Sequence, residues 1–317
     1  MSWLDQDLFQ GNLVGSSSVN SGEGGSLDEP CEEDCDDGGD DMYFLLGIFS
    51  VQYLELIDLN GDKILDILHT IPEGEKGVIG YSLGGPNLTS AKLDSKQIDV
   101  SGYGNPLLLS LANAGDLNED GADDCVIGSP AFEDVSEGDE VGSIFLLYGG
   151  RTDFNGFVDK RITAPKVGNS KPFGFGYSVR PAGDFDGDGF RDLFICSAEL
   201  MDGGDGDDSS DITSRAFLLH GSDGLNSPEL TELSLPAANI PALLNVHPIG
   251  DVNGDGFEDV IVTQFAIPFL DNGPKLLTHG SMLVFGGKKE NLQTGLTVRV
   301  LKSPNGDDSL LFGSGVI

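Results

Sequence analysis

Positive charge is scarce in this sequence of 317 residues. Only 17 Lys and Arg face 53 Asp and Glu, which gives a formal net charge of −36 at pH 7. A surface this negative repels nucleic acid and anionic membranes. No run of about 18 apolar residues occurs, so no segment is expected to cross a membrane as a helix. The composition therefore argues against a nucleic-acid partner and against a membrane span in this chain.

Histidine and cysteine are also rare. The spacing of the four histidines fits neither a transition-metal site nor a charge relay, so structural or solvent-facing roles are expected for His69, His220, His247 and His279. Cys31 and Cys35 lie in an acidic run and suit a local disulfide of an oxidising compartment or, less favourably, a metal pair. Cys125 and Cys196 lie in apolar segments, which favours two buried thiols over a cross-link.

One acidic loop of nine residues occurs four times, with side-chain oxygens at positions 1, 3, 5 and 9. The first positions of successive copies lie 58, 68 and 67 residues apart, which indicates an internal repeat. Calcium takes about six to eight oxygen ligands, and alternate residues of a curled loop can turn their oxygens toward one point. We therefore predict three to four Ca²⁺ sites. The predicted ligands are Asp58, Asn60, Asp62, Asp66, Asp116, Asn118, Asp120, Asp124, Asp184, Asp186, Asp188, Asp192, Asp251, Asn253, Asp255 and Asp259.

Position 6 of the loop is expected to need a positive φ angle, which favours glycine. Three copies have glycine there, namely Gly121, Gly189 and Gly256. The first copy has Lys63, which predicts a weaker or empty first site.

Position 12 separates these loops from two helical calcium motifs. EF-hand and dockerin-type loops carry an acid there on a helix, whereas this chain has His69, Ile127, Ile195 and Val262. The residues that follow each last Asp are apolar and largely β-branched, which predicts a buried strand directly after the loop.

A second apolar segment with flanking glycine follows each loop, at residues 77–85, 142–150, 215–221 and 280–287. Apolar or aromatic residues paired with glycine precede the first three loops, at Leu46-Gly47, Tyr103-Gly104 and Phe173-Gly174-Phe-Gly176. These segments are expected to be strands too, and no unit shows a convincing helix. The pattern predicts an all-β fold.

Together these residues resemble the FG-GAP repeat of integrin-α-type β-propellers, and Gly128-Ser129-Pro130 stands where that family has Gly-Ala-Pro. The resemblance implies a β-propeller of four-stranded blades over residues 42–317, with the calcium loop between the first two strands of each blade. About four blades and the start of a fifth are expected, whereas the family usually closes with seven. A fragment, closure by oligomerisation and a small four-bladed ring are the three explanations, and Phe312-Gly313 near the end favours the fragment.

Residues 1–41 are interpreted as an acidic, Gly/Ser-rich tail or linker. They lack a basic start followed by an apolar stretch of about 7–15 residues, so no signal peptide is visible.

Catalysis is not expected, and no catalytic residue or organic cofactor is assigned. Gly80-Tyr-Ser82-Leu-Gly84 matches the G-x-S-x-G nucleophile elbow, which needs a helix after the serine. Here the segment aligns with the repeated strand at residues 142–150, and Pro86 follows it. A pair of carboxylates could serve a glycosidase, but the sequence does not single out a pair.

The resemblance implies an extracellular or cell-surface calcium-binding module for adhesion or ligand recognition. Its protein or glycan ligand would bind inter-strand loops on the face opposite the calcium loops, for which residues 131–141, 199–214 and 265–279 are the candidates. The sequence leaves two alternatives. One is a fragment of a calcium-dependent carbohydrate-active enzyme, a lyase or hydrolase, and the other is a structural repeat of a large adhesin.

Overall fold

The computed structural model describes residues 54–73, 76–86, 96–99, 110–130, 133–134, 139–140, 142–150, 154, 156, 158–165, 174–201, 211–222, 225–226, 228–233, 235, 243–266, 269–270, 273–274 and 277–301. All of them belong to one compact unit, Ile48–Ile317. The predicted tail at residues 1–41, with Cys31 and Cys35, lies outside the described residues, and so do Leu46-Gly47 and Tyr103-Gly104. The division at residue 41 stays a prediction.

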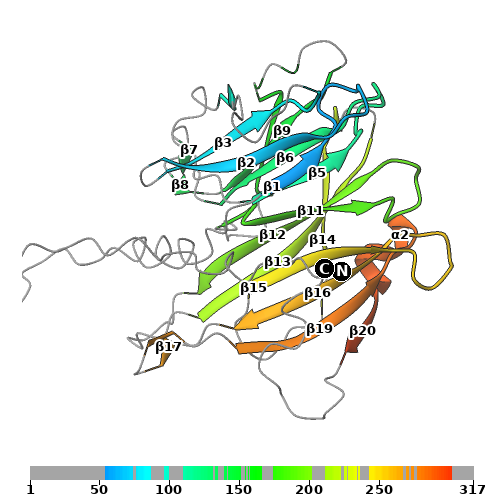
Figure 1. Cartoon of the computed structure of the whole chain (residues 1–317). Helices are drawn as coiled ribbons and strands as arrows, with labels where there is room; N and C mark the ends of the chain where they lie inside the picture. Colours follow the sequence, from blue (N-terminus) through cyan, green and yellow to red (C-terminus); the bar gives the residue numbers. More distant parts are fainter. Residues whose placement is uncertain are drawn as a thin grey trace, which may run out of the picture. The chain divides into compact units, whose positions relative to one another are not determined.

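The described chain forms four antiparallel sheets of four strands each, as the all-β prediction requires (Figure 1). Sheet 1 has the order β1 (Leu54–Ile57), β2 (Asp66–Glu73), β3 (Lys76–Ser82), β4 (Lys96–Gln97), and sheet 2 the order β5 (Ser110–Gly115), β6 (Asp124–Ser129), β9 (Ser143–Leu147), β10 (Lys160–Thr163). Sheet 3 has β11 (Ser178–Gly183), β12 (Asp192–Met201), β13 (Asp211–His220), β14 (Glu229–Leu233), and sheet 4 has β15 (Leu243–Gly250), β16 (Asp259–Ala266), β19 (Leu277–Phe285), β20 (Thr297–Leu301).

Two small hairpins lie between the second and third strands of their sheets. They are β7 (Glu133–Asp134) with β8 (Asp139–Glu140) in the second unit, and β17 (Phe269–Leu270) with β18 (Gly273–Pro274) in the fourth. They fall within two of the candidate ligand segments.

The predicted calcium loops join the first and second strands of each sheet. We name them loop 1 (residues 58–66), loop 2 (116–124), loop 3 (184–192) and loop 4 (251–259). The ninth residue of every loop is also the first residue of the second strand. The prediction that a strand, and not a helix, follows the loop is therefore confirmed in all four units.

Successive sheets are packed against each other by three clusters of buried apolar side chains, one at each junction. Neighbouring residues of a second strand point to opposite clusters. Cys125 and Ile127 face sheet 1, whereas Val126 between them faces sheet 3. Because both faces of an inner sheet are covered, its second strand reads as a continuous apolar run rather than an alternating one.

The two outer faces of this set of sheets are more exposed than the inner junctions. Leu54 in β1 is 63% exposed, but the residues at the same register position in the other three sheets, Leu111, Val179 and Val246, are fully buried. At the other side Val252, the second residue of loop 4, is 52% exposed. Residues at the same repeat position are therefore buried where another described sheet lies beside them and exposed where none does.

A helix in the fourth unit contradicts the expectation of no helices. Helix α2 (Lys289–Gly295) follows β19 and carries Leu292 into the cluster between sheets 3 and 4. Its sequence, Lys-Glu-Asn-Leu-Gln-Thr-Gly, starts with good helix formers and stops at glycine. The segment is too short for a helical period to be read from sequence.

The segment around Phe175 is not a strand, contrary to prediction. Gly174 and Gly176 have φ angles of +68° and +91°, which an extended strand does not allow. Phe175 is buried and makes only an isolated bridge to Gly142. A Cβ atom on Gly128 would lie 1.8 Å from the carbonyl oxygen of Gly176, so this glycine of the Gly-Ser-Pro segment permits close contact between two backbones.

Both buried cysteines are free thiols, as expected. Burial raises the pKa of Cys196 to about 12 and that of Cys125 further still, which makes both thiols inert at neutral pH.

Candidate calcium loops

The first, third and fifth residues of each loop bind the loop's own backbone. In loop 1, Asp58 Oδ1 accepts the N–H of Asp62 at 3.0 Å, and Asp58 Oδ2 accepts the N–H of Lys63 at 2.8 Å. Asn60 Oδ1 also accepts the N–H of Asp62. Loops 2 and 4 repeat these bonds. The loop is thereby curled around its own oxygen atoms.

Positive φ angles recur at positions 4 and 6. Position 6 has +67° at Lys63 and +92° to +95° at the three glycines Gly121, Gly189 and Gly256, which confirms the predicted need. Position 4 was not predicted, yet it has +69° at Gly61, +59° at Glu119, +73° at Gly187 and +79° at Gly254. Position 4 is glycine in three of the four copies, and this recurrence could have predicted the positive φ angle.

The ninth residue of each loop is fully buried and serves as a latch, a role that the sequence did not reveal. Asp124 Oδ2 accepts the N–H of Leu117 within its own loop, and Asp124 Oδ1 accepts the N–H of Gly149 just after the third strand, both at 2.7 Å. The same two bonds occur at Asp66, Asp192 and Asp259. Each unit thus ties its loop to its third strand through one carboxylate.

Two of these buried carboxylates, Asp124 and Asp192, are electrostatically strained. Burial raises the pKa of Asp124 and of Asp192 to about 7, although the backbone hydrogen bonds work in the opposite direction. Nearby carboxylates of the same loop raise the pKa further. A divalent cation beside them would supply the missing positive charge.

Loop 3 places three carboxylates together. Asp184, Asp186 and Asp188 offer ligand oxygens that all lie within 4.8 Å of one another. Asp184 Oδ1 is buried and has no hydrogen-bond partner, so one oxygen of the cluster is left for a cation. The donor set consists of oxygens only, which suits Ca²⁺. The residues of loop 3 therefore fit the predicted ion.

Loops 1, 2 and 4 have an asparagine at position 3 instead. Its side-chain nitrogen donates to the carboxylate at position 5, at 3.3 Å from Asn60 to Asp62, 3.4 Å from Asn118 to Asp120 and 2.9 Å in loop 4. Each of these loops therefore has one carboxylate fewer than loop 3 among its predicted ligands, and the ligand role of the sixteen predicted residues stays a prediction.

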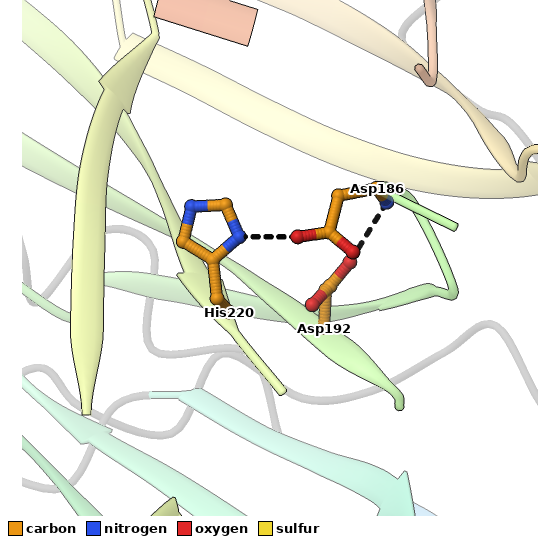
Figure 2. A group of neighbouring side chains, drawn as sticks. All are labelled: Asp186, Asp192 and His220. Carbon is orange, nitrogen blue, oxygen red and sulfur yellow. Dashed lines mark hydrogen bonds and ion pairs between the residues drawn. The ribbon is translucent and has the colours of Figure 1, made fainter. Parts of the chain in front are cut away.

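A second acidic group in loop 3 includes a histidine that the sequence reading did not connect with the site. Figure 2 shows His220 from the end of β13 pointing at Asp186, with Asp192 beside them. His220 Nδ1 lies 2.7 Å from Asp186 Oδ2, and His220 Nε2 lies 2.8 Å from Thr231 Oγ1. His220 is therefore buried within the structure and is not solvent-facing.

Ser82 does not occupy a nucleophile elbow. It is the last residue of β3, pairs with Ile67 of β2 and is 1% exposed. The described residues 83–86 that follow it contain no helix.

The structure contains four antiparallel sheets of four strands, and the first strands of successive sheets lie side by side. An acidic loop joins the first two strands of each sheet. This arrangement defines an all-β protein built of β-propeller blades. No protein-family model matches the chain. It is 26% identical to integrin alpha-5 of Xenopus laevis over 241 residues, which cover 72% of this chain and 20% of that protein. It is 29% identical to integrin alpha-4 of Xenopus laevis and 30% identical to integrin alpha-PS5 of Drosophila melanogaster, each over 146 residues, 44% of this chain and 13% and 14% of those proteins.

The chain thus carries an integrin-α-like FG-GAP region. Its matches span a fifth or less of these relatives. In the part of the chain that the structure describes, no helix is long and apolar enough to cross a bilayer.

Proposed function

We propose that this chain is an extracellular or cell-surface β-propeller module for adhesion or ligand recognition, in which Ca²⁺ bound at three to four of the loops stabilises the blades. The observation that carries the proposal is loop 3, where a buried oxygen of Asp184 lacks any partner amid three clustered carboxylates. The repetition of the same loop fold in the other three units supports it.

Calcium would act on the junctions between blades as well as on each loop. The carbonyl oxygens of Asp58 and Leu59 in loop 1 accept the N–H groups of Asp123 and Gly150 of the next unit, at 2.8 and 2.9 Å. Loop 3 makes the same pair of bonds to the fourth unit, at Glu258 and Gly287. Because the loop that would hold the ion also holds the neighbouring blade, a cation that orders the loop also orders the junction.

The ligand is proposed to bind away from the calcium loops. In every sheet the loop joins the first strand to the second, so the connection from the second strand to the third leaves from the opposite end of the sheet. The candidate segments at residues 131–141, 199–214 and 265–279 contain these connections in the second, third and fourth units, and the last two also include the ends of the strands that flank them. The proposal that these segments bind a protein or glycan is supported by analogy with the integrin α chains that the sequence resembles.

The test is a calcium titration by calorimetry, paired with thermal melts in calcium and in chelator. Three or four sites and a clearly higher melting temperature in calcium are expected, because binding to the folded state alone adds about 2.7 kcal/mol of stability at a concentration of 100 Kd. Magnesium is the control, since it demands a tighter octahedral geometry. A melting temperature that is equal in calcium and in chelator would contradict the proposal.

A further inference from the structure

Loop 3 differs from the other three units at two places at once. Its third residue is Asp186, where the others have Asn60, Asn118 and Asn253. The second place is next to Gly221, whose N–H group binds the ninth-position Asp of loop 3. The residue before this glycine is His220, and the residues at the same place in the other units are Leu83, Tyr148 and Phe285. The two changes meet in space, although 34 residues separate them in the chain.

The first change removes a hydrogen-bond donor. In loop 4, Asn253 Oδ1 accepts the N–H of Asp255, and Asn253 Nδ2 donates to the Asp255 carboxylate. Asp186 Oδ1 keeps the first bond, to the N–H of Asp188 at 3.1 Å. Its second atom is an oxygen and cannot donate, so a buried carboxylate oxygen needs a new donor.

His220 is that donor. A carboxylate accepts only, so the proton between Asp186 Oδ2 and His220 Nδ1 belongs to the imidazole. In the neutral ring, Nε2 is then the acceptor, and the Thr231 hydroxyl donates a hydrogen bond to it, with 2.8 Å between Oγ1 and Nε2. Asp186, His220 and Thr231 are each at most 4% exposed, so solvent does not replace either bond.

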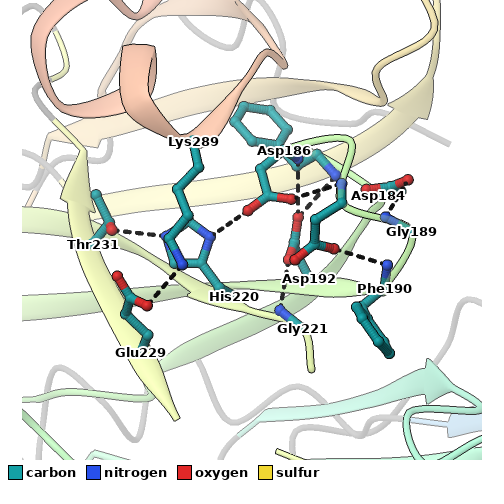
Figure 3. A network of polar contacts seen from close by, with 12 residues as sticks. Asp184, Asp186, Gly189, Phe190, Asp192, His220, Gly221, Glu229, Thr231 and Lys289 are labelled. Atoms are coloured by element: carbon teal, nitrogen blue, oxygen red, sulfur yellow. Dashed lines mark hydrogen bonds and ion pairs between the residues drawn. The ribbon is translucent and has the colours of Figure 1, made fainter. Parts of the chain in front are cut away.

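Figure 3 shows what lies over this chain of bonds. Lys289 of α2 forms an ion pair with Glu229 of β14 at 2.7 Å, beside the imidazole. Phe257 of the fourth unit lies against loop 3, because a Cβ atom on Gly187 would come within 2.4 Å of its ring. The fourth unit therefore packs against loop 3 and supplies Lys289 to the ion pair next to the histidine.

We propose that His220 is a positioning residue for the cation of loop 3. Its Nδ1–H group holds Oδ2 of Asp186 and leaves Oδ1 within the loop, and the Asp186 carboxylate, which only accepts, fixes the tautomer. The imidazole itself is not a ligand, since its Nδ1 carries the proton. This inference rests on the proposed binding of calcium to the loops.

The experiment compares three variants with the natural chain. His220→Phe copies the residue of the fourth unit and removes the donor. His220→Asn keeps an N–H donor near the place of Nδ1. Asp186→Asn combined with His220→Phe gives loop 3 both residues of the fourth unit, Asn253 and Phe285. Thermal melts at saturating calcium establish that each variant is folded.

Calcium affinity is read loop by loop from backbone amide resonances, because position 6 is a glycine in loops 2 to 4. Gly189 reports loop 3, and Gly256 is the control in the same sample. His220→Phe is expected to weaken calcium binding at Gly189 about tenfold, the usual effect of removing a partner that orients a metal ligand. His220→Asn should restore most of that affinity, and the double variant should bind better than His220→Phe alone. Binding at Gly256 should not change.

The proposal is overturned if His220→Phe binds calcium at Gly189 like the natural chain, or if His220→Asn is as weak as His220→Phe. It is also overturned if loop 3 prefers Zn²⁺ to Ca²⁺ and loses that preference in His220→Asn, because the imidazole would then be a ligand. If neither Gly189 nor Gly256 responds to calcium in the natural chain, calcium binding by the loops fails, and this inference fails with it. A response at Gly256 with no effect of His220 at Gly189 contradicts the positioning role alone.

Discussion

Lys63 offers a direct test of how backbone conformation limits loop 1. It is the only non-glycine residue at position 6, and its φ angle is +67°. A left-handed conformation costs an ordinary residue about 1–2 kcal/mol. Glycine removes this cost but loses about 0.5–1 kcal/mol through the greater freedom of the unfolded chain. Lys63→Gly should therefore raise the free energy of unfolding by about 0.5–1 kcal/mol.

The assay is a thermal melt with calcium held constant, and a shift of about 1–3 °C is expected. Lys63→Ala is the matched control, because it removes the same charge and keeps the strained backbone, so it should not stabilise the protein. The reciprocal change is Gly256→Ala, where an added Cβ atom would meet nothing within 4 Å and φ is +92°. It should destabilise by a similar amount. If Lys63→Ala stabilises as much as Lys63→Gly, charge rather than backbone strain limits loop 1.

Three further predictions use the repeat as its own control. Asp188→Ala should lower calcium affinity and melting temperature more than Asp62→Ala, because the strained Lys63 at position 6 leaves loop 1 the weaker site; equal losses in calorimetry would contradict this. Asp124→Ala should lower the free energy of unfolding, measured by urea denaturation, by about 2–6 kcal/mol, because it leaves two buried N–H groups without acceptors. A loss below about 1 kcal/mol would disprove the latch role. In the same assay, Leu111→Ala should lower the free energy of unfolding by about 2–5 kcal/mol and Leu54→Ala by less than about 0.5 kcal/mol, because of the two only Leu111 is packed between sheets. Similar losses would refute the difference between inner and outer faces.

Sequence reasoning succeeded where one unit could be checked against three others. The loop was recognisable because its oxygens recur at the same four positions in every copy. The second strands were recognisable because both of their faces are buried at the junctions, which leaves runs such as Cys125-Val-Ile127 without polar interruptions. The need for positive φ at position 6 followed from glycine in three copies and holds even at Lys63.

Other features depend on contacts between residues far apart in the chain. The N–H that Asp124 binds outside its loop belongs to Gly149, 25 residues later, and nothing local to Asp124 specifies it. A bulge before each of loops 2 to 4 shifts the register at Gly115, Gly183 and Gly250, but a single glycine before an acidic loop reads as an ordinary turn. The hydrogen bond between His220 and Asp186 also joins residues far apart in the chain.

The loop combines metal ligands with blade packing, and this explains how the unit can vary elsewhere. The side chains at positions 1, 3 and 5 turn inward, while the carbonyl oxygens at positions 1 and 2 of loops 1 and 3 point outward to N–H groups of the next unit. In loops 1 to 3 the second residue, Leu59, Leu117 or Phe185, is buried between its own sheet and the next. Lengthening a connection at the other end of a sheet disturbs neither set of contacts. The candidate ligand segments, which differ in length among the units, are therefore free to diverge while the loops keep their nine-residue pattern.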